Sequence, residues 1–443
     1  MAKFTLIGSG LAGGMFAAFL GRRGHEVALF ERRGDPHAGN LVGGRSINLA
    51  LSTRGLHALH QLGADDVLQH AIPMRGRMIH DCSGELHFSA YDRDPAKCIH
   101  SIGRGALNNA TLEAAQRYPN VRVHFNHVCT GVEVETATAQ LQDISTKQPV
   151  TASGDAIMGV DGAFSIVRRA LQRLPRFDYS QSFLPHGYKE FTIPPAADGT
   201  WQMEKHALHI WPRKSFMMIA LPNPDGSFTC TLFWQSEGPR SFATVETDDD
   251  RRRFFDEEFP DAVALMPRFL GEFRENPIGS LVTIRCGPWH HRDKVALVGD
   301  AAHAVVPFYG QGMNAAFEDC VELDDCLAEF PENRERAFAE YFLRRKENAD
   351  ALANLAVANF VEMRDKTASP VFRAKKKLDH FLEGALPGVY LPLYTMVSFT
   401  RIPYAEAARR ARRQDWILYS ALLGLVVLFL FVSGFLFWGL VRR

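Results

Sequence analysis

The chain has 443 residues, of which 46% are hydrophobic and 23% charged, a composition typical of a globular protein with room for two or three domains. Fifty basic residues balance fifty acidic ones, and no basic, aromatic-rich stripe stands out, so we expect no nucleic-acid partner. The seven cysteines are scattered without a C-x-x-C pair, which argues against a disulfide framework, a zinc site and a dithiol reductase.

The start of the chain predicts a βαβ unit. The expected elements are a strand over residues 4–7, a helix over 13–22 and a strand over 27–31. Between the first strand and the helix, Gly8 allows a tight turn, Gly10 lets the backbone approach a pyrophosphate, and Gly13 lets helix and strand pack closely. Glu31 closes the second strand, where a carboxylate can accept ribose hydroxyls. The pattern predicts a dinucleotide site without separating FAD from NAD; the alternative is a plain tight turn.

The predicted secondary structure changes in the middle of the chain. Alternating strands and helices are expected to about residue 173, and strand-rich segments broken by proline and glycine turns follow from 183 to 230. An antiparallel sheet inserted into the nucleotide-binding domain explains this change. The charge run at 248–253 predicts a solvated helix start, and residues 295–298 predict a buried strand. Helices are expected from 313 to about 382, with a break at Pro370.

Two later motifs favour a flavin over a nicotinamide as the resident dinucleotide. The stretch MGVDGAFSIVR, which contains Asp161, resembles the Asp-Gly motif of flavoprotein hydroxylases. The stretch VGDAAH, which contains Asp300, resembles their Gly-Asp motif, in which the aspartate contacts a ribitol hydroxyl. Gly310 and Gly312 then let backbone approach a flat ring, and the helix that starts at Met313 directs N–H groups at its edge.

Two residues of the Gly-Asp motif have other possible roles. Asp300 alone would read as a helix N-cap, a common use of aspartate. His303 is expected to be structural rather than a catalytic base. Three motifs in this order, spread over about 300 residues, make a coincidence improbable.

The last part of the chain predicts a membrane-spanning helix. Residues 417–440 carry no charge, and at 1.5 Å per residue they make roughly 36 Å of helix, enough to cross a hydrocarbon core of about 30 Å. The alternative is a long buried helix. The aromatic residues Trp416, Tyr419 and Trp438 lie near the two ends of the segment. The larger basic cluster precedes it and a smaller one follows, and no signal peptide precedes the body, so we expect a cytosolic body. The basic residues are Arg409, Arg410, Arg412, Arg413, Arg442 and Arg443.

Several long blocks resemble the kynurenine 3-monooxygenase family, within the class of FAD-dependent aromatic hydroxylases. They are GRSINLALS at 44–52, PMRGRMIH at 73–80, FDYS at 177–180, HIWP at 209–212, FMMIALP at 216–222, FVEMR at 360–364 and PLYTMVSFTRIPY at 392–404. The resemblance covers nearly the whole chain, including the apolar C-terminal segment.

The resemblance implies specific contacts. The implied substrate contacts are Arg77, Tyr91, Asn359 and Tyr394, and the segment from 81 to 97 departs from the family in composition. The implied flavin contacts are Ala12, Phe30, Glu31, Arg32, Arg33, Ala50, Arg104, Cys129, Asp300, Met313 and Asn314. The motifs themselves add Gly8, Gly10, Gly13, Asp161 and Gly312 to this second set.

The chemistry of L-kynurenine suits these substrate contacts. Arg77 could hold the carboxylate in a bidentate fork, with the hydroxyls of Tyr91 and Tyr394 beside it. Phe308 and Tyr309 could form an apolar wall near the arene. Without the resemblance, Arg77 would read as a surface arginine, and Asn359 and Tyr394 as helix-packing residues.

The implied protein is α/β, with a Rossmann-like FAD-binding domain, an inserted antiparallel β-sheet substrate domain, a C-terminal helical region and one transmembrane helix. The expected boundaries are 1–180 with 280–345, then 181–279, 346–415 and 416–440. NADPH would reduce the FAD and dioxygen would supply the oxygen that enters ring position 3 of L-kynurenine, so no catalytic side chain and no metal are expected.

Two other functions stay open at this point. A membrane-attached flavin dehydrogenase that passes electrons to quinone is compatible with the apolar C-terminal segment. A catalytically silent flavin-binding protein could use the basic cluster before that segment to bind anionic lipid.

Overall fold

A parallel sheet forms the centre of the computed structural model, which describes residues 1–36, 48–366, 370–386 and 388–441. Its order is β18 (His290–His291), β19 (Val295–Leu297), β12 (Ala156–Gly159), β1 (Lys3–Ile7), β2 (Glu26–Phe30) and β8 (Val121–His124). All neighbours are parallel except β18 and β19. The inner strands are buried on both faces, as expected for a sheet covered by helices.

A second, seven-stranded sheet is the inserted one. Its order is β17 (Gly279–Gly287), β13 (Asp178–Ile193), β16 (Phe228–Gln235), β15 (Met217–Pro222), β14 (Ala207–Pro212), β5 (Gly76–His80) and β6 (Leu86–Ala90). Its neighbours are antiparallel except β14 and β5. One face packs on an aromatic core that includes Trp211, Trp234 and Phe255, covered by α5 (Asp248–Glu258), α6 (Pro260–Val263) and α7 (Phe269–Glu275).

Three strands of this sheet lie wholly or almost wholly outside the expected substrate segment, residues 181–279. β17 enters that segment only at Gly279. β5 and β6 lie within the first hundred residues, and β5 pairs with β14 over Ala207↔Gly76 to Ile210↔Ile79. The antiparallel sheet is therefore inserted as predicted, while the boundaries of the four expected segments remain predictions. The strand that carries Arg77 joins the two parts of the chain.

Two small sheets complete the strand inventory of the described residues. One has the order β3 (Asn48–Leu51), β7 (Ile99–Gly103) and β4 (Ala71–Met74). The other is the antiparallel meander β11 (Pro149–Ser153), β10 (Thr138–Asp143) and β9 (His127–Glu133). The expectation of alternating strands and helices up to residue 173 is therefore wrong here, because short polar turns join these strands directly.

Helices cover the parallel sheet. They are α1 (Leu11–Arg22), α2 (Thr53–Gln61), α3 (Arg104–Gln116), α4 (Ile166–Leu171), α8 (Asp300–His303), α9 (Gly312–Glu329) and α10 (Arg334–Val361). α1 packs against α3 and α9, and α9 packs against α2 and α10. The chain then forms a π-helical turn at Glu362–Lys366 and the helices α11 (Pro370–Ala385) and α12 (Leu393–Phe399).

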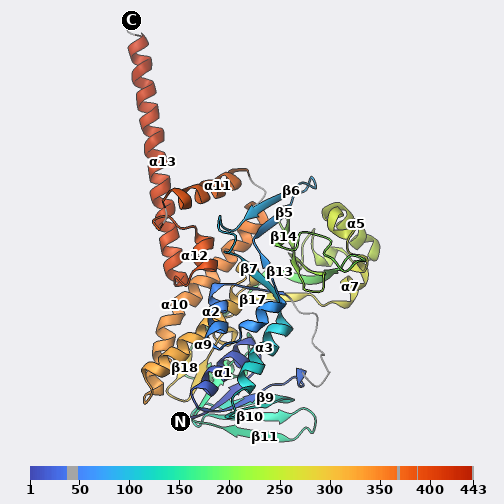
Figure 1. Cartoon of the computed structure of the whole chain (residues 1–443), viewed down its shortest axis with the longest axis vertical. Coiled ribbons are helices and arrows are strands. Elements are labelled where there is room, and N and C mark those ends of the chain that lie inside the picture. Colours follow the sequence, from blue (N-terminus) through green and yellow to red (C-terminus); the bar gives the residue numbers. More distant parts are fainter. Residues whose placement is uncertain (37–47, 367–369, 387, 442–443) are drawn as a thin grey trace.

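The final helix, α13 (Tyr404–Val441), begins in the body and leaves it (Figure 1). Its first turns pack against α10 and α12, and its apolar part is exposed, with Phe429 70% and Phe431 73% accessible. The helix is long and apolar enough to span a membrane, and the alternative of a buried core helix is wrong for the described part. The side chain of Trp438, residues 442–443 and residues 44–47 of the first family block lie outside the described residues.

Candidate active site

The glycine turn after β1 has little room for side chains on its inner side. Gly8 has φ +105°, and a Cβ there would lie 2.8 Å from the Val160 carbonyl oxygen. A Cβ on Gly13 would lie 1.9 Å from the Gly8 carbonyl oxygen, so the helix approaches the turn as closely as glycine permits. Among the described residues, no heavy atom lies within 4 Å of a Cβ built on Gly10. The turn is closed on one side and open on the side where a phosphate would bind the start of α1.

Glu31 follows β2 and is tied to this turn. Its Oε2 accepts hydrogen bonds from the Ser9 N–H at 2.8 Å and the Ser9 hydroxyl at 3.1 Å. Its Oε1 accepts from the Arg33 N–H at 2.9 Å and from Arg33 Nε at 2.8 Å. Burial alone would raise the pKa of Glu31, but the Arg33 and Ser9 donors outweigh it and lower the pKa. The carboxylate is thus ionised. These four donors, together with Arg33 Nη2 at 3.3 Å from Oε2, already use its lone pairs, so a ribose hydroxyl would have to replace one of them.

The three predicted motifs meet at one edge of the parallel sheet. β1, β12 and β19 are neighbours, so the turns that follow them, which carry Gly8, Asp161 and Asp300, lie side by side. Gly299 has φ +62°, and a Cβ there would lie 3.4 Å from the Ala12 Cβ. The turn that carries Asp300 therefore contacts α1, and the first and last of the three motifs are adjacent in the structure.

Asp300 faces open space. Gly299, not Asp300, is the N-cap of α8, and the Asp300 carboxylate makes no capping hydrogen bond within the described chain, so the N-cap reading is wrong. The side chain is accessible, yet enough protein surrounds it that desolvation raises the pKa of its carboxyl, while the nearby Arg104 lowers it. Arg104 is exposed at the start of α3. The acidic Asp300 side chain and the basic Arg104 side chain are thus close enough to interact.

Asp161 has a local task. Its Oδ2 accepts hydrogen bonds from the N–H groups of Ile166 at 2.7 Å and Val167 at 3.3 Å, which fixes the start of α4. Its Oδ1 is buried without a hydrogen-bond partner among the described residues. Burial raises the pKa of the nearby Cys129 thiol to about 11, with the Asp161 charge adding to it, so this thiol is neutral. Cys129 can contribute shape and backbone, but not charge.

Asn314 uses its whole side-chain amide within the protein. Its Oδ1 accepts from the Ser52 N–H at 2.9 Å, and its Nδ2 donates to the carbonyl oxygens of Ala50 and Gly310, both at 2.8 Å. The side chain therefore joins β3 to the glycine loop. Only the backbone N–H groups at the start of α9, those of Met313 and Asn314 included, remain to face a ring.

Three of the four expected substrate contacts lie together. The rings of Tyr91 and Tyr394 stack with their centroids 5.0 Å apart, and Tyr309 also stacks on Tyr394, at 5.8 Å. The Arg77 guanidinium carbon lies 4.8 Å from the Tyr394 centroid and 5.8 Å from that of Tyr91. Tyr91, in the segment that departs from the family in composition, is thus part of the cluster.

Arg77 is set among aromatic rings rather than on the surface, so the surface-arginine reading is wrong. Its Nε and the Tyr91 hydroxyl are buried without hydrogen-bond partners among the described residues. Burial opposes the charged form, but the polar environment of Tyr394, Tyr91 and Glu362 outweighs it and raises the pKa of Arg77. A charged donor and a hydroxyl therefore converge where an anion could bind.

Asn359 lies on the wall of this region. Its Nδ2 donates to the Phe308 carbonyl oxygen at 2.7 Å and lies 3.2 Å from the Met363 sulfur. Both partners belong to the surrounding packing, and neither is Arg77. Phe308 stacks on Phe360 with centroids 4.0 Å apart. Asn359 holds the loop between Asp300 and Gly310 through this bond to Phe308. This role agrees better with the alternative of a helix-packing residue than with a direct polar contact to the substrate.

The fold and the three turns define a class, the FAD-binding monooxygenases. The family described as "FAD binding domain" matches residues 2–356. The solved structure of the tetrameric form of 2-methyl-3-hydroxypyridine-5-carboxylic acid oxygenase has the same fold, with a TM-score of 0.67, 22% identity, and coverage of 84% of this chain and 95% of that one. PqsL from Pseudomonas aeruginosa, a probable FAD-dependent monooxygenase, has a TM-score of 0.63 at 20% identity, covering 85% and 99%.

Within that class, the chain belongs to the kynurenine 3-monooxygenase family. It is 47% identical to kynurenine 3-monooxygenase of Myxococcus xanthus over 414 residues, which cover 93% of this chain and 89% of that relative. It is 45% identical to kynurenine 3-monooxygenase of Dictyostelium discoideum over 433 residues, covering 95% and 93%. The family resemblance predicted from the sequence is confirmed.

Proposed function

We propose that this chain hydroxylates L-kynurenine at ring position 3, with bound FAD, with NADPH as the reductant and with dioxygen as the source of the new oxygen atom. Membership of the kynurenine 3-monooxygenase family over nearly the whole length supports this activity. The supporting observation within the molecule is the cluster of Arg77, Tyr91 and Tyr394, in which Arg77 Nε and the Tyr91 hydroxyl lack partners among the described residues.

The cluster suits an aromatic amino acid. A carboxylate would accept hydrogen bonds from Arg77 and Tyr91, which removes the cost of leaving those buried donors unpaired. The aromatic surroundings formed by Tyr91, Tyr309 and Tyr394 suit an aromatic amino acid. Because the amino group of an ortho-aminophenyl ketone itself donates electrons to the adjacent ring carbon, no side chain in the cluster has to remove a proton before the oxygen is transferred.

The residues at the sheet edge fit an extended FAD. We assign the pyrophosphate to the open side of Gly10 and the start of α1, the ribose to Glu31, and the ribitol to Asp300 with Arg104 nearby. The other proposed contacts, by backbone or shape, are Gly8, Ala12, Gly13, Phe30, Arg32, Arg33, Ala50, Cys129, Asp161, Gly312, Met313 and Asn314. When bound, FAD supplies the electron transfer and oxygen chemistry, which no side chain of the cluster could supply.

The chain's own residues position the substrate and exclude water. Phe308 packs between Phe360 and Phe233, at 4.0 Å and 4.8 Å between ring centroids, behind the loop that ends at Gly310. This apolar wall keeps bulk water from the space between the tyrosines and the start of α9. The free N–H groups at that helix start can stabilise negative charge on a reduced ring.

NADPH oxidation by the purified, FAD-loaded protein tests the proposal. We expect kynurenine to stimulate NADPH oxidation and to be converted to 3-hydroxykynurenine. A flavin dehydrogenase would instead reduce an added soluble quinone without forming a hydroxylated product. A silent flavin-binding protein would oxidise NADPH equally slowly with and without kynurenine. Either of the last two results would reject the proposed activity.

We further propose that residues 416–440 anchor the protein in a membrane, with the body in the cytosol. The exposed apolar stretch of α13 supports insertion, and Trp416 and Tyr419, 71% and 54% accessible, suit the interface. The exposed Arg412 and Arg413 precede the stretch, as expected for a cytosolic flank.

Introducing two arginines into the apolar stretch tests the proposed membrane anchor. Arginine near the centre of a span costs about 2.5–3.5 kcal/mol each, so L425R/L428R should move the protein from the carbonate-resistant membrane fraction to the soluble fraction. The control is L343R, because Leu343, at 69% accessible, is at least as exposed as Leu425 and Leu428, at 62% and 57%, but lies on α10. An L425R/L428R protein that stays in the membrane fraction would contradict the proposed span.

A further inference from the structure

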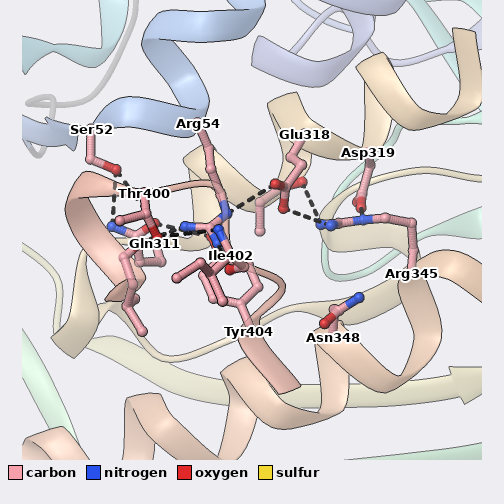
Figure 2. A network of polar contacts seen from close by, with 12 residues as sticks. Ser52, Arg54, Gln311, Glu318, Asp319, Arg345, Asn348, Thr400, Ile402 and Tyr404 are labelled. Carbon is pink, nitrogen blue, oxygen red and sulfur yellow. Dashed lines mark hydrogen bonds and ion pairs between the residues drawn. The ribbon is translucent and has the colours of Figure 1, made fainter. Parts of the chain in front are cut away.

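Buried charges of alternating sign connect three helices (Figure 2). Arg54 Nε donates to Glu318 Oε1 at 2.9 Å, and Glu318 Oε2 accepts from Arg345 at 2.6 Å. Arg345 Nε donates to Asp319 Oδ1 at 2.7 Å. All four side chains are buried, and they come from α2, α9 and α10. Each charge has a partner of opposite sign, which is the condition for burying such groups.

One end of this network holds the C-terminal segment. Arg54 donates to the carbonyl oxygen of Val397 at 2.5 Å and to that of Ile402, and its guanidinium lies 4.0 Å from the centre of the Tyr404 ring. Val397 is in the last turn of α12, where carbonyl groups have no partner within the helix and carry partial negative charge. Thr400 serves the same helix end, because its hydroxyl donates to the Met396 carbonyl oxygen at 2.5 Å.

The other end reaches the late aspartate turn. Asp319 Oδ2 accepts from the Gly299 N–H at 3.1 Å and pairs with His303 Nε2 at 2.5 Å. Gly299 and His303 flank Asp300, the residue assigned to the ribitol. His303 is therefore a structural residue in this network, as the sequence predicts.

A second link runs beside the first. The Tyr404 hydroxyl donates to Gln311 Oε1 at 3.0 Å, and Gln311 Nε2 donates to the Ser52 hydroxyl at 3.1 Å. Ser52 follows the strand with Ala50, and Gln311 is the N-cap of α9. The C-terminal segment is thus connected to the end of β3 and to the start of α9, which carry the proposed flavin contacts Ala50, Met313 and Asn314.

We propose that Arg54 is a positioning residue that holds α12, and with it Tyr394, in register with the flavin-binding turns. The inference rests on the proposed function, since Tyr394 is assigned there to the substrate. Arg54 touches neither substrate nor flavin, and acts by capping the end of α12 and by pairing with Glu318. Tyr394 stands three residues before the bonded Val397, less than one helical turn away, so a shift of this helix end moves the ring that stacks on Tyr91.

The experiment compares Arg54 variants with a matched control in the full-length protein. R54K keeps the charge but cannot make all three donations in the same planar geometry, and R54M removes the charge. The control pair is R334K and R334M, because Arg334 likewise donates to two backbone carbonyls, of Asp293 and Asp155, and to one carboxylate, at the start of α10. T400V weakens the same end of α12 by another route, and remains informative if R54M does not fold.

Two readouts are taken on samples with equal FAD content. Amide exchange in Leu393–Phe399 should become about tenfold faster in R54K and T400V, and unchanged in R334K. The apparent KM for kynurenine should rise about tenfold in R54K, with less 3-hydroxykynurenine formed per NADPH oxidised. A purely structural role would lower the folded yield of the Arg54 and Arg334 variants alike, and leave KM and the product ratio of the folded enzyme unchanged.

Unchanged exchange in α12, or an unchanged KM and product ratio, in FAD-loaded R54K would overturn the inference. Failure of the proposed function is distinguishable, because the wild type itself would then form no hydroxylated product. The exchange measurement needs no substrate and would still decide whether Arg54 holds α12.

Discussion

Replacing Arg77 with methionine should weaken kynurenine binding without affecting FAD. Methionine fills a similar volume but removes the Arg77 guanidinium, which lies 4.8 Å from the Tyr394 ring centroid. The Nε of this guanidinium has no hydrogen-bond partner in the described structure. If a substrate carboxylate pairs with this group, truncation leaves that carboxylate buried and unpaired. Such a loss costs roughly 2–4 kcal/mol, which corresponds to a dissociation constant raised between about 30-fold and about 1000-fold.

The assay is an equilibrium titration with kynurenine, followed through the flavin absorbance spectrum. R75M is the control, because Arg75 is exposed only two residues before Arg77. R77K should be intermediate, since an ammonium keeps the charge but not the bidentate fork. A folded, FAD-loaded R77M protein with the affinity of the wild type would refute the assignment of Arg77 to the carboxylate.

Two further predictions concern the cofactor and the pH dependence of stability. Glu31→Ala should raise the dissociation constant of FAD about tenfold or more, because a charged acceptor is lost. The control, Glu26→Ala, changes the exposed start of β2 and should leave this constant unchanged. Equal FAD retention in both variants would count against the ribose assignment. Burial lowers the pKa of His209 from 6.5 to about 4. As the pH falls below about 6.5, His209 therefore gains a proton in the unfolded chain but not in the folded chain. The free energy of unfolding decreases as the pH is lowered over this range. Between pH 7.5 and pH 5 the wild type should lose about 2 kcal/mol more unfolding free energy than His209→Gln, and equal losses in urea denaturation would contradict the neutral state of His209.

The elements with local chemical reasons could be predicted from the sequence. Gly8 and Gly13 are needed because backbone atoms of the turn leave no room for a Cβ, and this constraint is visible in the spacing of three glycines after a strand. The buried strand at 295–298 and the capped helix at Asp248 follow from equally local signals. The adjacency of the three motif turns follows from parallel strands whose carboxyl ends share one sheet edge.

The rest depends on contacts between distant residues. Arg54 is fully buried because Glu318, 264 residues away, neutralises its charge and the Val397 carbonyl oxygen, 343 residues away, accepts one of its hydrogen bonds. No local pattern distinguishes it from a solvated arginine. β5 likewise joins the seven-stranded sheet only through its pairing with β14. For the same reason Asn359 could be predicted to face the pocket region, but not that Phe308 would take its amide donor.

Isotope labelling tests the central claim most directly. The full-length, FAD-loaded protein is incubated with L-kynurenine and NADPH under oxygen-18 gas, and the product is analysed by mass spectrometry. One oxygen-18 atom in 3-hydroxykynurenine, with one NADPH consumed for each product molecule, is the predicted result. NADPH oxidation without labelled product, or a product whose oxygen comes from water, would contradict a monooxygenase built around the arginine and tyrosine cluster.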